Sequence, residues 1–317
     1  MRIVFMGTPE FAISVLTQLA LNRYHIAAVY TQPDRPSGRG RALIPPPVKK
    51  VALDLGLPVM QPASLKGDEV AAQLTALNPD AIVVAAFAQL LPKSVLSIPR
   101  YGCVNIHPSL LPRYRGASPV AAVILGGDEF TGVSIIRMDS GLDTGPVFLQ
   151  GRIPVSERDT TGSLTAKLSH ISAGMLQEVL VRLERGDIVL RPQDNEKATY
   201  FGSFEKKDGE IDWMKPAQEI WRRVRAFQPW PGCYTTWLGK QLKIIEAVPL
   251  SASTDQKPGE VVALPDVAGK TQPAFGVGTG GGVLGILRLQ IEGKQAMPSD
   301  DFLRGQRQLI GAILPSD

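Results

Sequence analysis

Two polar side chains that could act on a reacting group close an apolar run near the middle of the chain. Asn105 and His107 alternate with Ile106, and Pro108 follows them directly. If this run is a strand, alternation places both side chains on one face at its carboxyl end, where open α/β sheets bind ligands. An amide donor beside an imidazole suits oxyanion stabilisation and proton transfer. The same tripeptide would also arise from a turn-capping asparagine and a surface histidine.

A second group of candidate residues lies in the glycine-rich stretch 137–146. Asp139 and Asp143 both stand in this stretch, without the DxDxDG spacing of a calcium loop. Either carboxylate could orient His107 or a water molecule, or could only cap a turn. The local pattern leaves these alternatives open.

Metal and dinucleotide sites are not indicated by the sequence. The chain has 3 histidines and 2 cysteines, Cys103 and Cys233, with neither HxxxH nor CxxC spacing, so we expect no metal site and no disulfide scaffold. The Gly-Thr-Pro turn at 7–9 stands where a GxGxxG fingerprint would. It lacks the later glycines, and its proline removes a backbone donor, which argues against a nicotinamide dehydrogenase. The glycine-rich run 278–282 predicts a hairpin turn, because no helical pattern follows it.

The elements that would position these groups alternate between strands and helices in the first part of the chain. Near-continuous apolar runs, typical of parallel strands covered on both faces, occupy 2–6, 25–30, 81–87 and 103–106. Helical spacing of apolar residues occurs at 11–20, 46–55, 68–77 and 161–184. This alternation predicts an α/β domain over residues 1–188 with a mostly parallel sheet.

A shift in composition separates this domain from the rest of the chain. Residues 189–205 are polar and have no periodic pattern, so we interpret them as a linker. Five short apolar runs separated by glycine and proline turns follow at 234–237, 242–245, 260–263, 275–277 and 283–287. They predict a smaller antiparallel, OB-like β-barrel domain over residues 206–317.

Composition restricts the class of protein. A length of 317 residues fits two domains at about 150 residues each. With 44% hydrophobic and 20% charged residues the chain is not disordered, and its longest apolar run, 81–88, is far shorter than a membrane span of ~20 residues. We therefore expect a cytoplasmic protein with no membrane partner. The net charge of +4 is by itself too small to indicate a nucleic-acid partner.

Four segments taken together resemble one known family. They are Asn105-x-His107 followed by 109–116, then 141–145, 31–40 and 225–232. The first two carry the signature of the folate-dependent formyltransferases, and the last two are similar only to the branch of that family that acts on methionyl-tRNA. The resemblance spans both predicted domains. It implies a Rossmann-like first domain, an OB-like second domain and 10-formyltetrahydrofolate as the formyl donor, with no metal.

The resemblance also implies roles for individual residues. Asn105, His107 and Asp143 match the catalytic residues: the amine of methionine on initiator tRNA attacks the formyl carbon, Asn105 and His107 stabilise the oxyanion, and Asp143 holds His107. The implied folate-binding residues are Ser109, Leu110, Leu111, Pro112, Phe87, Gln89 and Leu91. Relatives more commonly have Tyr and Gly where this chain has Phe87 and Ala88, which keeps an aromatic wall but loses a hydroxyl and stiffens the backbone.

A basic segment suggests where a nucleic acid would bind. Residues 31–50 hold five basic side chains against one acidic residue, Asp34. The resemblance implies initiator methionyl-tRNA as the partner, with Arg39 and the second domain in contact with it, and the local charge adds Arg41 and Lys49 as tRNA-binding residues. An ordinary solvated loop would have the same composition. We expect the protein to be a monomer.

Two rival functions remain open at this point. A formyltransferase acting on a small amine would share the catalytic signature, but it would need neither the basic segment nor the second domain. A non-catalytic RNA-binding protein of the same fold would have no need of an intact Asn105, His107 and Asp143.

Overall fold

The computed structural model describes residues 1–37, 42–250, 256–265 and 272–315, and the chain divides into two compact units. Unit 1 comprises Met1–Pro119, Glu129–Val155 and Leu164–Gly202. Unit 2 comprises Val120–Asp128, Ser156–Ser163 and Ser203–Asp317. No helix within the described ranges is both long and apolar enough to cross a membrane.

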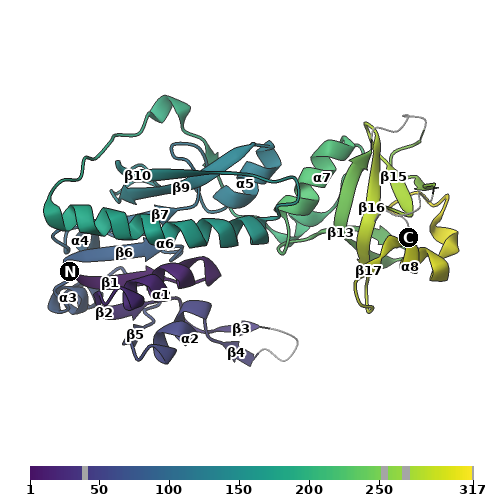
Figure 1. Ribbon diagram of the computed structural model, residues 1–317. Helices are drawn as coiled ribbons and strands as arrows, with labels where there is room; N and C mark the ends of the chain where they lie inside the picture. The colour runs from purple at the N-terminus through teal and green to yellow at the C-terminus, as the bar shows by residue number, and fades with distance from the viewer. Residues whose placement is uncertain (38–41, 251–255, 266–271, 316–317) are drawn as a thin grey trace. The chain divides into compact units, whose positions relative to one another are not determined.

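A seven-stranded sheet forms the centre of unit 1 (Figure 1). In spatial order its strands are β10 (Val147–Pro154), β9 (Phe130–Arg137), β7 (Cys103–His107), β6 (Ala81–Ala85), β1 (Arg2–Gly7), β2 (His25–Tyr30) and β5 (Val59–Met60). The five strands from β7 to β5 are parallel, and β9 and β10 extend the sheet in antiparallel order. The predicted α/β class with a mostly parallel sheet is confirmed.

Helices and short strand pairs connect and cover these strands (Figure 1). The α-helices are α1 (Ile13–Leu21), α2 (Pro47–Asp54), α3 (Asp68–Ala76), α4 (Lys93–Leu96) and α6 (Thr161–Arg185), and two 3-10 turns are η1 (Glu10–Ala12) and η2 (Asn195–Lys197). The short pairs are β3 (Arg35–Ser37) with β4 (Ala42–Ile44) and β8 (Arg115–Gly116) with β11 (Tyr200–Phe201). In α6 the Ser169 hydroxyl donates to the carbonyl oxygen of Phe11 at 2.7 Å, so α6 packs against η1.

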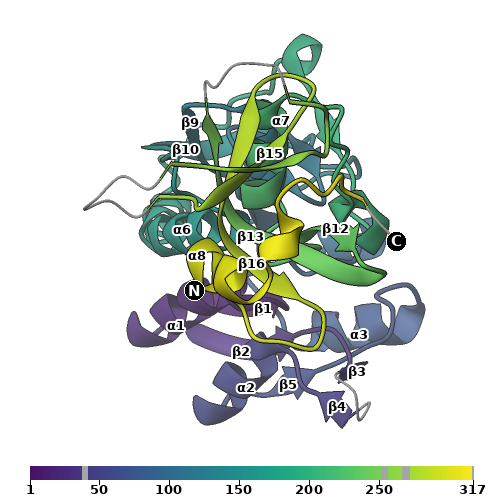
Figure 2. The ribbon, with the colours of Figure 1, turned by 90° about the vertical axis from the view of Figure 1, so that its right-hand side faces the viewer.

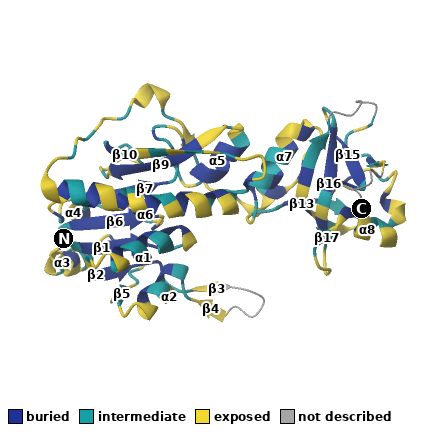
Figure 3. Cartoon of the chain, viewed as in Figure 1, coloured by how far each residue is buried: buried dark blue, intermediate teal, exposed yellow. Residues whose placement is uncertain are grey.

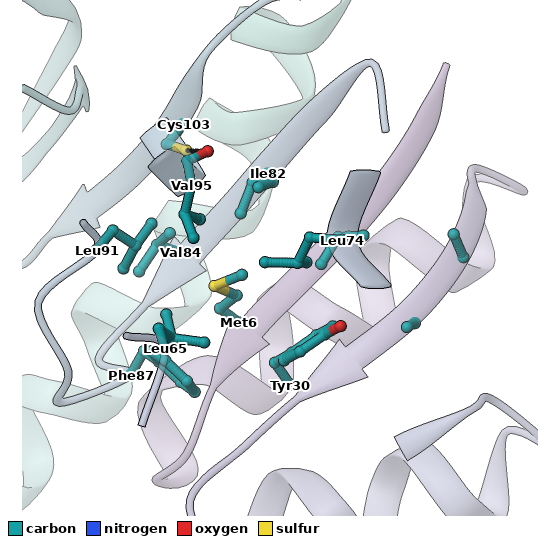
Figure 4. Packing of buried hydrophobic residues seen from close by; sticks show 13 residues of the cluster. Met6, Tyr30, Leu65, Leu74, Ile82, Val84, Phe87, Leu91, Val95 and Cys103 are labelled. Atoms are coloured by element: carbon teal, nitrogen blue, oxygen red, sulfur yellow. Dashed lines mark hydrogen bonds between the residues drawn. The ribbon is translucent and has the colours of Figure 1, made fainter. Parts of the chain in front are cut away.

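The apolar strands are buried on both faces (Figure 3). Met6 of β1 and Val84 of β6 pack on one face against Leu74 of α3 and Val95 of α4 (Figure 4). Phe5, which points to the opposite face by alternation, is also fully buried. Burying each such side chain contributes about 1.5–3 kcal/mol, so the sheet is a firm base for the loops at its carboxyl ends.

The strand order reverses beside β1. The chain passes from β1 to β2 on one side and later returns to β6 on the other side, so the loops after β1 and β6 diverge. Ligands of open α/β sheets bind in the crevice outside such a point. A Cβ at Gly7 would lie 2.8 Å from the Cβ of Ala12 and 3.0 Å from the carbonyl oxygen of Ala85. Only glycine therefore allows the end of β1 to approach both neighbours so closely.

The polar stretch after α6 makes specific contacts within unit 1. Arg191 forms an antiparallel bridge with Val147, and β11 pairs in parallel with β8. Residues 189–205 were expected to be a linker. Those up to Gly202 belong to unit 1, and Ser203 begins the main part of unit 2. The domain limits expected from the sequence stay a prediction.

An antiparallel sheet forms the centre of unit 2. Its strands in order are β12 (Cys233–Trp237), β13 (Lys240–Leu250), β16 (Val283–Ile291), β15 (Phe275–Gly278) and β14 (Val261–Ala263), with β17 (Met297–Pro298) paired to β16. Figure 2 shows the long strands β13 and β16 side by side. The α-helices are α5 (Pro119–Gly126), α7 (Ala217–Ala226) and α8 (Ser299–Gly305), and two 3-10 turns are η3 (Lys206–Gly209) and η4 (Arg307–Leu309). The second, antiparallel domain is confirmed, and its OB-like character stays a prediction.

Candidate active site

The three predicted catalytic residues lie together at the carboxyl end of β7. Asn105 and His107 are both buried, with 9% and 4% of their surfaces exposed. Asn105 Nδ2 donates to Oδ1 of Asp143 at 3.3 Å, and His107 Nδ1 lies 3.6 Å from Oδ2 of the same carboxylate. An amide, an imidazole and a carboxylate therefore share one small volume, which is a combination able to stabilise negative charge and move a proton.

The loop between β9 and β10 brings Asp143 to this place by an indirect route. Because β9 is antiparallel to β7, its last residue, Arg137, pairs with Val104 near the amino end of β7. The loop must then turn back along β7 before its carboxylate can reach His107. Asp143 has a φ of +55°, in the left-handed region that residues with a side chain adopt at a cost.

The tautomer of His107 follows from its second contact. Nε2 lies 2.9 Å from the backbone oxygen of Tyr114. A carbonyl oxygen only accepts, so Nε2 must carry a hydrogen and donate it. In the neutral ring Nδ1 then has the free lone pair, and this is the nitrogen that faces Asp143.

The two carboxylates of the loop have different environments. Asp143 Oδ2 accepts from the backbone N–H of Gly116 at 2.9 Å, in addition to its contacts with β7. Asp139 Oδ1 accepts from the backbone N–H of Gly141 at 3.0 Å and from the hydroxyl of Thr144 at 2.6 Å. Asp139 is thus a turn cap, and Asp143 is the acid placed next to the imidazole. The sequence alone could not distinguish them.

One residue at the site was not anticipated. Gln193 Nε2 donates to the backbone oxygens of both Asp143 and Gly145, at 2.8 and 2.7 Å. It comes from the polar stretch interpreted as a linker, and no local feature of that stretch distinguishes it from its neighbours.

The predicted folate segment 109–112 follows β7 directly and is braced by β9 and β10. Ser134 donates its hydroxyl to the backbone oxygen of Ser109 at 2.7 Å and accepts from the N–H of Leu111 at 3.0 Å. Gln150 Nε2 donates to the Leu111 oxygen at 2.8 Å. Leu110 and Pro112 are partly exposed between these fixed points, whereas Leu111 is buried.

The other predicted folate residues lie in the loop after β6. Phe87 and Leu91 pack into the core beside this loop (Figure 4). Gln89 accepts from the N–H of Leu65 at 3.1 Å and donates to the Pro62 oxygen at 3.3 Å, so it ties this loop to the segment before α3. Ala88 has a φ of +62°, a conformation that glycine would adopt without strain.

The predicted tRNA-binding residues can be followed only in part. Arg39 and Arg41 lie outside the described residues. Lys49 Nζ contacts both oxygens of Asp34, at 2.8 and 2.9 Å, and Gln61 donates to Asp34 at 2.7 Å. The hydrogen bond from Gln61 and then that from Lys49 lower the pKa of Asp34. The Lys49 ammonium is therefore held by a carboxylate of its own chain.

In the described ranges, no group of three or more His, Cys, Asp or Glu side chains could hold a metal ion. The expected absence of a metal stays a prediction.

Comparison with known proteins identifies the class. Residues 1–180 match the family model described as formyl transferase, and residues 203–307 match the model described as the formyl transferase C-terminal domain. The chain belongs to the formyl transferase family.

Its relatives within that family have a specific activity in their names. The methionyl-tRNA formyltransferase of Dehalococcoides mccartyi is 52% identical over 99% of this chain and 98% of its own. The methionyl-tRNA formyltransferase of Marinobacter nauticus is 44% identical over 98% of each chain.

Solved structures of more distant proteins have a similar fold. WlaRD, a sugar 3N-formyl transferase, aligns with a TM-score of 0.63 at 19% identity over 93% of this chain and 99% of its own. HypX from Aquifex aeolicus in complex with tetrahydrofolic acid aligns with a TM-score of 0.63 at 21% identity over 96% of this chain and 47% of its own.

Proposed function

We propose that this chain transfers the formyl group of 10-formyltetrahydrofolate to the amino group of methionine on initiator tRNA. The observation that carries the proposal is that Asn105 and His107 of β7 lie in contact with Asp143. In the sheet β7 is the neighbour of β6, and β6 is the neighbour of β1, where the strand order reverses. The relatives from Dehalococcoides and Marinobacter, which match over nearly their full length, support methionyl-tRNA rather than a small amine as the acceptor.

The reaction sets two tasks for the protein. A bond forms between the amine nitrogen and the formyl carbon, the bond from that carbon to the folate nitrogen breaks, and one proton passes from the amine to tetrahydrofolate. The formyl oxygen becomes negative on the way and needs a donor. Asn105 Nδ2 has two hydrogens, and Asp143 accepts only one of them, so the other serves the oxyanion.

His107 serves the proton transfer through Nδ1. Its Nε2 hydrogen is held by the Tyr114 oxygen, so Nδ1 is the nitrogen that takes the proton of the amine and returns it to the leaving group. The carboxylate of Asp143, 3.6 Å away, attracts the imidazolium formed in between. In the neutral ring Nδ1 has no hydrogen, so His107 can donate toward the oxyanion only after Nδ1 has taken the amine proton.

The folate donor would bind beside these residues, at the carboxyl ends of β7 and β6. The segment 109–112 and the loop with Phe87, Gln89 and Leu91 follow β7 and β6, the strands next to the reversal. This place fits a planar heterocycle, because the partly exposed Leu110 and Pro112 lie there beside backbone polar groups. Hydrogen bonds from Ser134 and Gln150 would keep 109–112 in place during binding.

Initiator tRNA would contact Arg39, Arg41 and Lys49 and the surface of unit 2. The support in unit 2 is a hollow of about 940 Å³. Its lining has three arginines, Arg158, Arg225 and Arg288, against two glutamates, Glu157 and Glu246, and it also includes Trp221. The Arg225 guanidinium lies 4.2 Å from the centre of the Trp221 ring. Guanidinium groups bind phosphates and aromatic rings stack on bases, so this hollow suits a nucleic acid. We further expect a cytoplasmic monomer.

The test is a formylation assay with competing acceptors. The purified chain is given 10-formyltetrahydrofolate with initiator methionyl-tRNA, with elongator methionyl-tRNA, or with a nucleotide-linked amino sugar. We expect formylmethionyl-tRNA from the initiator at a rate that exceeds the other two by about 10²-fold or more, as expected when remote contacts position the reacting ends. Transfer to the amino sugar alone would replace the proposal with the small-amine alternative. No transfer to any acceptor would favour a non-catalytic RNA-binding protein.

A further inference from the structure

A partly buried amide, that of Gln193, and a buried guanidinium, that of Arg115, lie behind the Asp143 loop. The Nε2 of Gln193 donates to the backbone oxygens of Asp143 and Gly145, and its Oε1 accepts from Nε and Nη2 of Arg115 at 3.2 and 2.8 Å. One side chain therefore joins the loop between β9 and β10 to β8, which follows β7. All of these residues belong to unit 1.

The partners of Gln193 allow its amide only one orientation. A guanidinium only donates hydrogen bonds and a backbone carbonyl only accepts them. The amide oxygen must face Arg115, and the amide nitrogen must face the loop. Glutamate has the same length but offers acceptors in both directions, so it could pair with Arg115 and not with the two carbonyls.

Arg115 is a rigid anchor for this amide. Only 1% of its surface is exposed. Its Nη1 donates to the hydroxyl of Tyr200 at 2.9 Å and its Nη2 to Oδ1 of Asn195 at 2.8 Å. The hydrogen-bond partners of this buried cation are thus neutral oxygens. A guanidinium can stay buried in this way only while its donors are satisfied, so any movement of the group is costly.

We propose that Gln193, held by Arg115, is a positioning residue that sets the place of the Asp143 carboxylate relative to His107. The inference rests on the proposed function, since it assigns Gln193 to that reaction. The loop reaches His107 only by turning back along β7, and Asp143 has a positive φ at the point of contact. The two bonds from Gln193 hold the backbone at that residue and two positions later. A displacement of the reacting groups by ~1 Å costs roughly 10²-fold in rate.

Gln193→Glu is the most direct test. The variant gains an ion pair with Arg115 but places a carboxylate oxygen against the carbonyls of Asp143 and Gly145. We expect a melting temperature close to that of the wild type, a KM for methionyl-tRNA within about twofold, and a kcat lower by about 10- to 100-fold. An unchanged kcat in this folded variant would overturn the proposal.

Tyr200→Phe is the matched control. It removes one hydrogen bond from the opposite end of Arg115 and leaves Gln193 and the loop untouched. Its kcat should stay within about twofold of the wild type, as expected for a substitution that does not move the reacting groups. A loss as large as that of Gln193→Glu would mean that general loosening around Arg115, and not the position of the loop, controls the rate, and the proposal would fall.

A double-mutant cycle asks whether Gln193 acts through Asp143. In an Asp143→Ala background, Gln193→Ala should lower the residual kcat by less than about twofold, because the carboxylate that it positions is already gone. Equal factors in the two backgrounds would make Gln193 a structural residue and contradict the inference.

Hydrogen exchange distinguishes a failure of this inference from a failure of the proposed function. In Gln193→Ala the amides of 141–145 should exchange faster, while those of β1 keep the wild-type rate. If the wild-type chain formylates no methionyl-tRNA, the proposed function fails and the exchange rates alone decide whether Gln193 holds the loop. Unchanged exchange in 141–145 would overturn the inference whatever the activity.

Discussion

Replacing Asp143 by asparagine separates the charge of this residue from its shape. The carboxylate accepts from the Gly116 N–H at 2.9 Å and from Asn105 Nδ2 at 3.3 Å, and it faces Nδ1 of His107 at 3.6 Å. An amide has one acceptor oxygen, so it cannot serve all of these groups. The side chain keeps its size, but the attraction for an imidazolium is lost.

The distance to His107 gives the expected magnitude. At an effective dielectric constant of about 20, unit charges 3.6 Å apart attract by about 5 kcal/mol. This is an upper limit, because the Asp143 side chain is 14% exposed and the imidazolium exists only while the proton is in transit. If half of the attraction acts in the transition state, its loss raises the barrier by about 2–3 kcal/mol and lowers kcat by roughly 10²-fold.

The assay is single-turnover formylation of initiator methionyl-tRNA at saturating 10-formyltetrahydrofolate. Asp139→Asn is the matched control, since Asp139 stands in the same loop and caps a turn through Gly141 and Thr144. It should lose about 1 kcal/mol of stability and less than about threefold in rate. An Asp143→Asn enzyme within threefold of the wild type would refute the electrostatic argument. Equal losses in the two variants would assign the effect to the loop backbone instead.

Three further predictions concern stability. Ala88→Gly should raise the free energy of unfolding by about 1 kcal/mol in urea titrations, because Ala88 has a φ of +62°, whereas Ala71→Gly within α3 should lower it by about as much. Gly116→Ala should cost about 2 kcal/mol or more, because its Cβ would overlap a backbone oxygen of β11 at a φ of +104°. Burial raises the pKa of Cys103 and of Cys233 to about 12. Unfolded thiols titrate at about 8.5, so the unfolded chain loses these protons first. The contribution of the two thiols to stability is constant below that pH and falls above it by about 1.4 kcal/mol per pH unit per thiol. Cys103→Ala should halve that slope between about pH 8.5 and the onset of tyrosine ionisation at about pH 10.

The sequence predicted what depends on neighbours along the chain. Alternation in the run before Pro108 placed Asn105 and His107 on one face, and β7 ends at His107. Near-continuous apolar runs predicted the parallel strands, because a strand covered on both faces has no polar side. Turn chemistry at 278–282 predicted the hairpin that joins β15 and β16.

The sequence could not predict what depends on partners far along the chain. Asp139 and Asp143 share one glycine-rich loop, and only the backward turn of that loop along β7 makes one of them a cap and the other a partner of His107. Gln193 lies in a stretch with no periodicity, and its hydrogen-bond partners are 48 to 78 positions away. No pattern of local spacing can reveal contacts of that kind.

The antiparallel strand β9 explains why the site needs the stretch after α6. A parallel strand in its place would deliver the following loop directly to the carboxyl end of β7, where His107 stands. Because β9 runs the other way, the loop begins at the amino end of β7 and has to return to its carboxyl end. Gly145 allows this return, since a Cβ at that position would overlap the backbone oxygen of Arg137. A loop that turns back in this way is not held by the ladder of backbone hydrogen bonds that joins paired strands. Gln193, reaching across from outside the sheet, supplies hydrogen bonds of the kind that a neighbouring strand would otherwise have made.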